Sequence, residues 1–403
     1  MTAQPAASPA RTEWRPLAPF IAILGLAEYA HAGLLFVVLP HYVTTRFHAG
    51  MASAGGIVGV YYLAEFILKV PTGWLADRLG RRRLILAAVA VSALGYALAA
   101  TATTLAGVTV GVFLHGFGAS PLWPSTTAAT ADRTPEDRRG HALGVVFALW
   151  LVSLGLGYGS LNLLVPRGPR VAFGVIGVAW LVATVVALVA PEVRLTAHAD
   201  SAATPFEALR ALKRNLRPLR LILFGMFIQT MNVGLTMPCF REYAMAELKL
   251  GEWGVTKLLL LGGGFTVLLL IPFGHIGDRQ GPRRLLLTGL VVSAAALVML
   301  PLFRSLWLVA GAVSLLGVGY ALVVPAWNNI VIRHIAEHER ALMLSAFMAM
   351  ELVGMSVGAP LGGALWDNWG RAAPFLFSGT ALGLLALLYW FRLDVPPVER
   401  EGS

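Results

Sequence analysis

The fold of this chain is decided by two copies of one short motif, GWLADRLGRRR at residues 73–83 and GHIGDRQGPRR at residues 274–284. The copies are offset by 201 residues (274 − 73). The offset superposes Gly73, Asp77, Arg78, Gly80, Arg82 and Arg83 on Gly274, Asp278, Arg279, Gly281, Arg283 and Arg284. It also superposes Gly33 on Gly234, Tyr42 on Tyr243 and Pro124 on Pro325. The two halves of the chain are therefore copies of one unit.

The composition predicts that this duplicated unit lies in a membrane. Hydrophobic residues make up 57% of the 403 and charged residues 13%, whereas a soluble domain carries about 25% charged residues. A bilayer-spanning helix needs roughly 20 mostly apolar residues. We predict spans near residues 17–40, 51–76, 84–103, 106–130, 141–165, 171–190, 219–243, 255–277, 285–303, 306–332, 341–366 and 373–392. The expected fold class is an all-α polytopic membrane protein with twelve transmembrane helices in two six-helix, pseudo-symmetric halves.

The distribution of basic residues predicts the orientation of these spans. The net charge is +10, and most lysines and arginines fall in segments that share a side with the N-terminus. The positive-inside rule therefore places both termini in the cytoplasm, and no nucleic-acid partner is expected. We divide the chain into a cytoplasmic tail (1–16), a first half (17–190), a linker (191–218), a second half (219–392) and a C-terminal tail (393–403).

The second part of the predicted linker has a pattern of its own. In PFEALRALKRNLRPLR, residues 205–220, apolar side chains at helical spacing stand opposite basic ones. This pattern is typical of an amphipathic helix on an anionic leaflet. An ordinary basic linker is the alternative.

The motif, its position between the second and third spans and the twelve spans together resemble the major facilitator superfamily of transporters. That resemblance implies two halves that rock about a site between them near mid-bilayer. In the motif, Gly73 and Gly80 permit a tight turn, and Asp77 can accept hydrogen bonds from arginines or a helix N-terminus across the seam. The predicted conformational gate consists of Gly73, Asp77, Arg78, Gly80, Arg81, Gly274, Asp278 and Arg279. The alternative for the arginines is that they only anchor the topology.

Within the superfamily, several stretches resemble the proton-coupled bacterial flippases that move the glycolipid anchor of lipoteichoic acid. They are Glu28 to His31, Ala64-Glu65, Ser120 to Trp123, Trp150 with Asn162, and Pro325 to Asn328. Two positions depart from the flippases, which have an arginine at His31 and an aspartate at Glu65. The run GMSVGAPLGG at 354–363 resembles the glycine-proline motif of drug/proton antiporters, but it falls in span eleven instead of span five. We interpret it as a helix-packing element.

Three carboxylates, Glu28, Glu65 and Glu351, fall deep within predicted spans. An ionised side chain at mid-bilayer costs on the order of 2.5–3.5 kcal/mol, so such residues usually face a cavity and a partner. Glu28 and His31 share a helical face, and Glu65 and Lys69 have the i,i+4 spacing of an ion pair. We predict that Glu28 and Glu65 couple transport to protons and that His31 tunes or accepts the proton. The alternative is that these are structural pairs within the first half.

The expected substrate cavity combines aromatic and amide side chains. Three tryptophans lie inside spans, away from the interfacial belt where tryptophan gathers, and two amides of the second half match Glu28 and His31 under the repeat. The predicted lining is Trp123, Trp150, Gln229, Asn232, Trp327, Asn328 and Glu351. Core packing is the alternative for each tryptophan, and a position near a span end is the alternative for Glu351.

These features predict a proton-coupled secondary transporter in the plasma (inner) membrane that moves an amphipathic substrate, a lipid-linked saccharide or a hydrophobic compound, by alternating access. The alternatives are a multidrug/proton antiporter, a sugar or metabolite symporter and a membrane protein without transport. We expect a monomer that needs no cofactor beyond the proton gradient, and we see no metal-ligand spacing or catalytic constellation that would indicate an enzyme.

Overall fold

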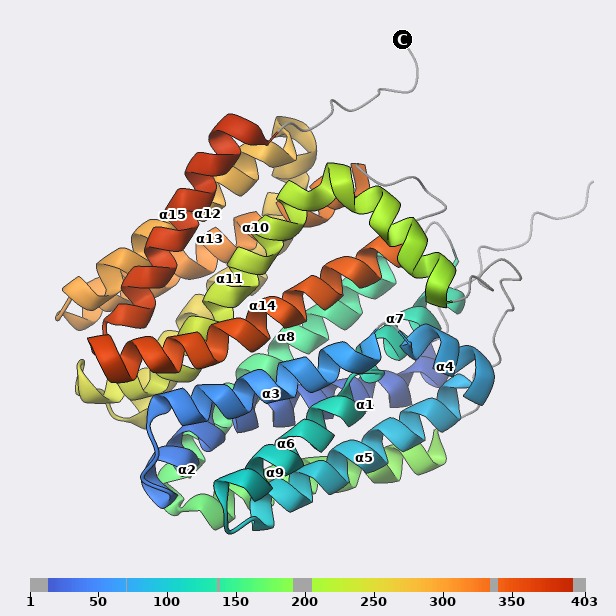
Figure 1. The fold of residues 1–403 in the computed structure, drawn as a ribbon, viewed down its shortest axis with the longest axis horizontal. Coiled ribbons are helices and arrows are strands. Elements are labelled where there is room, and N and C mark those ends of the chain that lie inside the picture. Colours follow the sequence, from blue (N-terminus) through green and yellow to red (C-terminus); the bar gives the residue numbers. More distant parts are fainter. Residues whose placement is uncertain (1–13, 70, 136–137, 191–204, 334–339, 394–403) are drawn as a thin grey trace, which may run out of the picture.

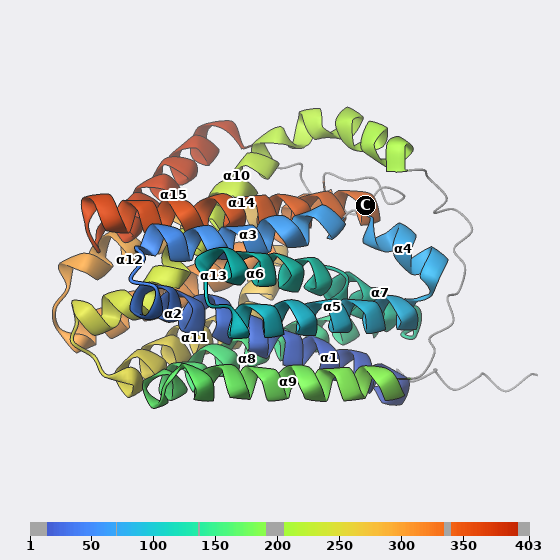
Figure 2. The same cartoon turned by 60° about the horizontal axis from the view of Figure 1, so that its bottom comes forward.

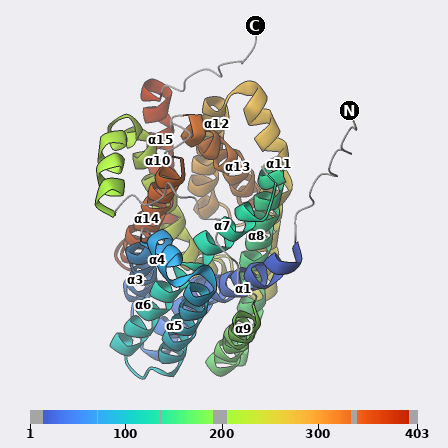
Figure 3. The ribbon, with the colours of Figure 1, turned by 90° about the vertical axis from the view of Figure 1, so that its right-hand side faces the viewer.

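The computed structural model describes residues 14–69, 71–135, 138–190, 205–333 and 340–393, and all regular structure within these ranges is helical. Twelve of the helical segments described are long and apolar enough to cross a membrane. Six of them lie in each half of the chain, and Figure 3 shows most of the C-terminal half above the N-terminal half. The fold class predicted from the sequence is confirmed.

The N-terminal half contains α1 (Trp14–Gly33), a π-helical turn η1 (Leu34–Val38), α2 (Leu39–Arg46), α3 (Met51–Lys69), α4 (Thr72–Leu79), α5 (Arg81–Thr101), α6 (Leu105–Ala119), α7 (Leu122–Asp132), α8 (Arg139–Leu164), η3 (Val165–Arg167) and α9 (Pro169–Val189). The C-terminal half contains α10 (Pro205–Ala246), α11 (Glu252–Gln280), α12 (Pro282–Met299), η4 (Leu300–Leu302), α13 (Leu306–Arg333), α14 (Arg340–Trp369) and α15 (Ala373–Arg392).

The seam between the halves follows from the repeat. The main contacts across it pair α3 with α14 and α8 with α11. Because the repeat relates α3 to α11 and α8 to α14, the two interfaces are exchanged by the pseudo-two-fold axis. Figures 1 and 2 both show α3 and α14 side by side at the centre of the molecule.

Glycines of the 354–363 run allow α14 to sit in this central position. A Cβ on Gly354 or Gly358 would come within 3 Å of α10, and one on Gly363 would lie 2.1 Å from the backbone oxygen of Met51 on α3. Close approach of helix backbones through small residues is the usual way membrane helices associate. The packing role predicted for this run agrees with these contacts.

Prolines shift several helix ends away from their predicted positions. The second span was expected to reach residue 76, but α3 ends at Lys69, and the chain restarts as α4 after Pro71. The fourth span is divided into α6 and α7 at Ser120 and Pro121. Proline removes a backbone donor and clashes with the preceding turn, which interrupts a helix. The first span is longer than predicted and runs from Trp14 to Arg46.

The predicted linker and second half meet within one helix. α10 begins at Pro205 and continues to Ala246 as a helix of 42 residues, and Figure 1 shows its first turns at an angle across the end of the bundle. Residues 191–204 and the side chains of 205–219 lie outside the described part of the chain. The amphipathic surface expected there stays a prediction.

Candidate functional site

The motif turns lie at one end of the bundle, which we call the basic end. Gly80 and Gly281 directly precede α5 and α12, with φ angles of 78° and 89°, a region that favours glycine. The tight turn predicted at Gly80 is therefore present in both repeats. Gly73, expected in the turn, instead lies inside α4, because the chain resumes its helix directly after Pro71.

The other predicted gate residues are placed less completely. Arg78 is exposed, Arg81 is half-buried, and Gly274 lies in α11 near Pro325. The side chains of Asp77, Asp278 and Arg279 lie outside the described part of the structure, and so does the solvent exposure of Gly73. The bonds predicted for Asp77 therefore stay a prediction.

Glu65 and Lys69 form the ion pair that their spacing predicts. The Lys69 Nζ atom lies 2.8 Å from Glu65 Oε1, and the lysine and glutamate side chains are only 7% and 14% exposed, respectively. The backbone oxygen of Glu65 also accepts a hydrogen bond of 2.7 Å from the Ser120 hydroxyl, at the break between α6 and α7. This bond fixes the end of α3 against the fourth span.

His31 is held between two tyrosines of α3. Its Nδ1 atom lies 3.0 Å from the hydroxyl of Tyr61, and its Nε2 atom lies 3.1 Å from that of Tyr62. A hydroxyl donates or accepts, so either tautomer of the neutral ring has both nitrogens satisfied. The hydrogen bonds of His31 thus join the first and second spans, whereas the sequence suggested Glu28 as its partner.

Glu28 lies beside an aromatic cluster. Trp150 on α8 and the Glu65–Lys69 pair of α3 are the polar neighbours of its carboxyl group. Trp150 in turn packs edge-on against Trp123 of α7, with ring centroids 5.7 Å apart, and stacks on Phe147 at 5.3 Å. The first, second, fourth and fifth spans therefore bring an acid, an ion pair and three aromatic rings together.

Glu351 is the contribution of the C-terminal half to this group. It lies on α14, and the charges of Lys69 and Glu65 act on it across the seam between the halves. The side chain is half-buried. We call Glu28, Glu65, Lys69 and Glu351 the central charged group; it contains three carboxylates and one ammonium.

The remaining predicted cavity residues are distributed differently. Trp327 is 3% exposed and packs against Tyr389 of α15, inside the C-terminal half. Asn232 is buried and donates to the Ile228 backbone oxygen at 2.7 Å, in its own helix. Gln229 is half-buried, and the side chain of Asn328 lies outside the described residues.

A polar network at the other end of the bundle joins the two halves. The guanidinium of Arg241, with its side chain 3% exposed, donates to Asn162 Oδ1 at 2.7 Å and pairs with Glu242. Asn162 donates to Thr256 Oγ1 at 3.0 Å and to the Glu252 backbone oxygen at 2.8 Å. The sequence offered a signal that was missed, because Arg241 is a cation inside an apolar span.

A second contact at this end caps α3. The carboxylate of Asp367, at the end of α14, accepts hydrogen bonds from the backbone N–H groups of Met51 at 3.0 Å and Ala52 at 2.8 Å. His41 of α2 lies 3.5 Å from the Glu242 carboxylate. Because these contacts and the Arg241 network tie the two halves together here, we call this end of the bundle the closed end.

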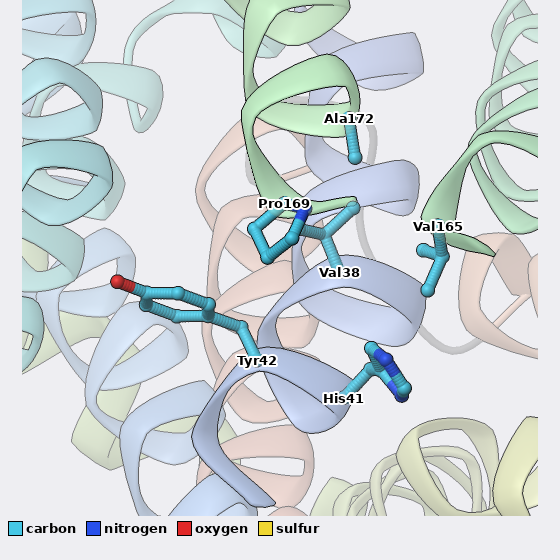
Figure 4. Close-up of a pocket in the computed structure, with 6 residues that line it drawn as sticks. All are labelled: Val38, His41, Tyr42, Val165, Pro169 and Ala172. Atoms are coloured by element: carbon cyan, nitrogen blue, oxygen red, sulfur yellow. The ribbon is translucent and has the colours of Figure 1, made fainter. Parts of the chain in front are cut away.

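A small hollow beside His41 is no substrate site. Figure 4 shows it between Val38, Tyr42, Val165 and the first turn of α9. Its volume of about 10 Å³ is at the lower limit for holding one water molecule.

The fold and repeated motif agree with the comparison against known families. The model of the Major Facilitator Superfamily matches residues 21–238 and again residues 222–403, so the chain belongs to this superfamily of transporters.

Among individual proteins, the chain is 25% identical over 396 residues to the proton-coupled antiporter flippase LtaA of Staphylococcus aureus strain USA300, covering 91% of this chain and 92% of the relative. It is 22% identical over 389 residues to the LtaA of Staphylococcus haemolyticus strain JCSC1435, covering 92% of each.

Two solved structures share the fold at lower identity. The crystal structure of an auto-inhibited POT family peptide transporter superposes with a TM-score of 0.74 at 18% identity, covering 96% of this chain and 99% of that one. The crystal structure of a point mutant of the nucleoside transporter NupG gives a TM-score of 0.75 at 14% identity, covering 94% and 100%.

Proposed function

We propose that this transporter couples the movement of an amphipathic substrate to protons, and that the central charged group is where the two meet. The observation that carries the proposal is the largely buried ion pair of Glu65 with Lys69, which has two further half-buried carboxylates, Glu28 and Glu351, within reach of its charges. Charges withdrawn from water need partners. With three carboxylates and one ammonium, the group has a net negative charge when all four are ionised. Bound protons neutralise the excess carboxylates.

The arrangement supports alternating access between the two ends. The Arg241 network and the contact of Asp367 with α3 must both separate before the central charged group can be reached from the closed end. We infer that the closed end faces outward, that the basic end and both termini are cytoplasmic, and that the protein works as a monomer in the plasma membrane with no cofactor. The division into tails, halves and linker predicted from the sequence is part of this proposal.

The surroundings of Glu28 support the proposed substrate class. Trp123, Trp150 and Phe147 offer aromatic faces beside a carboxylate, and sugar rings and apolar groups both pack on such faces. The similarity to flippases named proton-coupled antiporters supports a lipid-linked saccharide. The excess of acids over lysine favours a second candidate, a lipophilic cation held by charge and by cation–π contact.

The test is transport by purified protein in liposomes under an imposed pH gradient. A fluorescent diglycosyl lipid is scored for movement between leaflets, and ethidium, a lipophilic cation, is scored for accumulation. We expect gradient-driven movement of one of the two by the wild type, and a fall to the level of protein-free liposomes for Glu28→Gln and Glu65→Gln, which keep the side-chain volume and remove the titratable group.

The matched control is Glu247→Gln. Glu247 is also a carboxylate in an ion pair, but its partner Arg371 is half exposed and lies at the closed end, away from the central charged group. This variant should transport like the wild type. Full gradient-driven transport by both Glu28→Gln and Glu65→Gln would refute proton coupling at these residues.

A further inference from the structure

A groove on the outer surface of the C-terminal half lies away from the central charged group. It has a volume of about 430 Å³ and runs between α12 and α15. Its walls are Leu287, Thr288, Val291, Val292, Gly383, Ala386, Leu387 and Trp390. From residue 383 to residue 390 the groove spans about 10 Å along α15, at 1.5 Å per residue.

The depth of the groove comes from small residues on α15. The bonds from Arg82 to Leu188 and from Arg283 to Trp390 relate α9 to α15 at an offset of 202 residues (390 − 188). At this offset Gly383 and Ala386 correspond to Leu181 and Thr184. A Cβ placed on Gly383 would meet only the Cβ of Ala294, at 3.9 Å. The glycine is therefore not required by packing, and its absent side chain leaves space at the position where the other repeat carries Leu181.

Basic residues stand at one mouth of the groove. Arg283 donates to the backbone oxygen of Trp390 at 2.7 Å, joining the first turn of α12 to the last turn of α15. The N-terminal repeat has the same bond, from Arg82 to the Leu188 backbone oxygen at 2.9 Å. Trp390 is 64% exposed, as suits a residue at the membrane–water interface.

Arg284 is placed to serve a ligand in this groove. It is exposed, and it precedes Leu287 and Thr288 by three and four residues, so all three share one helical face. Its long side chain can keep the guanidinium at the polar surface while its stem lies along the apolar wall. A basic mouth above an apolar groove at the cytoplasmic surface has the chemistry of an anionic lipid site.

We propose that the groove between α12 and α15 binds an anionic phospholipid, with an acyl chain against Gly383 and Ala386 and the phosphate at Arg284. Arg283 is a positioning residue, because its bond to Trp390 holds the two helix ends together. The site is independent of the central charged group, and binding can be measured without transport.

The test is native mass spectrometry of the delipidated protein titrated with phosphatidylglycerol or phosphatidylethanolamine. The wild type should prefer phosphatidylglycerol. Arg284→Gln should weaken binding of the anionic lipid about five-fold, the effect of one basic residue at an anionic surface. Gly383→Val, which adds a side chain inside the groove, should reduce the binding of both lipids.

Arg83→Gln is the matched control, because Arg83 holds the equivalent position in the N-terminal half and should leave binding unchanged. Val291→Phe fills the groove from its exposed rim and replaces Gly383→Val if that variant fails to fold. Equal loss with Arg83→Gln and Arg284→Gln, or wild-type binding by the groove-filling variants, would overturn the proposal. A dimer that the groove-filling variants dissociate would also overturn it, because a second copy would then occupy the groove.

Discussion

Asp367 should control how often the closed end opens. Its carboxylate accepts two hydrogen bonds from the first turn of α3, across the seam. A hydrogen bond to a charged group is worth about 1.5–3 kcal/mol when protected from water. Asp367 is exposed, so we take about 1–3 kcal/mol for the pair together. Asp367→Ala should therefore raise the ratio of open to closed molecules by about five- to 150-fold.

The assay is a distance measurement between spin labels on the two sides of the closed end. Arg167 in the N-terminal half and Trp253 in the C-terminal half are both exposed, and each accepts a label once replaced by cysteine in a background that lacks Cys239. The long-distance population should grow in Asp367→Ala and grow less in Asp367→Asn, which keeps one acceptor oxygen.

Asn368→Ala is the control, because Asn368 is the exposed neighbour and donates to its own helix, at the Ala364 backbone oxygen. Distance distributions that are the same for Asp367→Ala and Asn368→Ala would show that the cap does not hold the halves together.

Two further substitutions examine the same seam. A Cβ on Gly55 would lie 2.1 Å from the Ala359 backbone oxygen, whereas one on Gly56 meets nothing within 4 Å. Gly55→Val should therefore abolish transport in liposomes, and Gly56→Val should not. Equal activities of the two variants would contradict the packing argument. Arg241→Met removes one member of a buried ion pair and should lower the free energy of unfolding by about 3–5 kcal/mol. Arg371→Met, at an exposed pair, should lower it by about 1 kcal/mol or less; denaturant titration of both proteins in detergent would contradict the prediction if the two losses were similar.

The sequence predicted those features that depend on local pattern. Twelve spans follow from apolar runs, the turns at Gly80 and Gly281 follow from the repeat, and the ion pair of Glu65 with Lys69 follows from helical spacing. Helix ends were less predictable where proline lay inside an apolar run, as at Pro71, because an apolar run continues whether or not the helix does.

The partners of side chains on different helices could not be read in the same way. That His31 contacts Tyr61 and Tyr62 depends on how α1 and α3 are rotated against each other, which no spacing within one helix determines. The sequence likewise places Glu351 in the C-terminal half, but its position near the Glu65–Lys69 ion pair of α3 could not be predicted. These contacts depend on tertiary packing, whereas the i,i+4 pair depends on one helix alone.

The two halves also differ where their symmetry brings them together. His41 and Glu242 occupy equivalent positions under the repeat (41 + 201 = 242), and they lie 3.5 Å apart across the seam. Identical ionisable residues at such a position would repel or be neutral together, and like charges juxtaposed at an interface are costly. An ionic attraction between equivalent positions at the pseudo-two-fold axis therefore requires that the two copies carry different residues there. The same first spans carry Glu28 in one half and Gln229 in the other, so the copies have also diverged at the position of the first-span carboxylate.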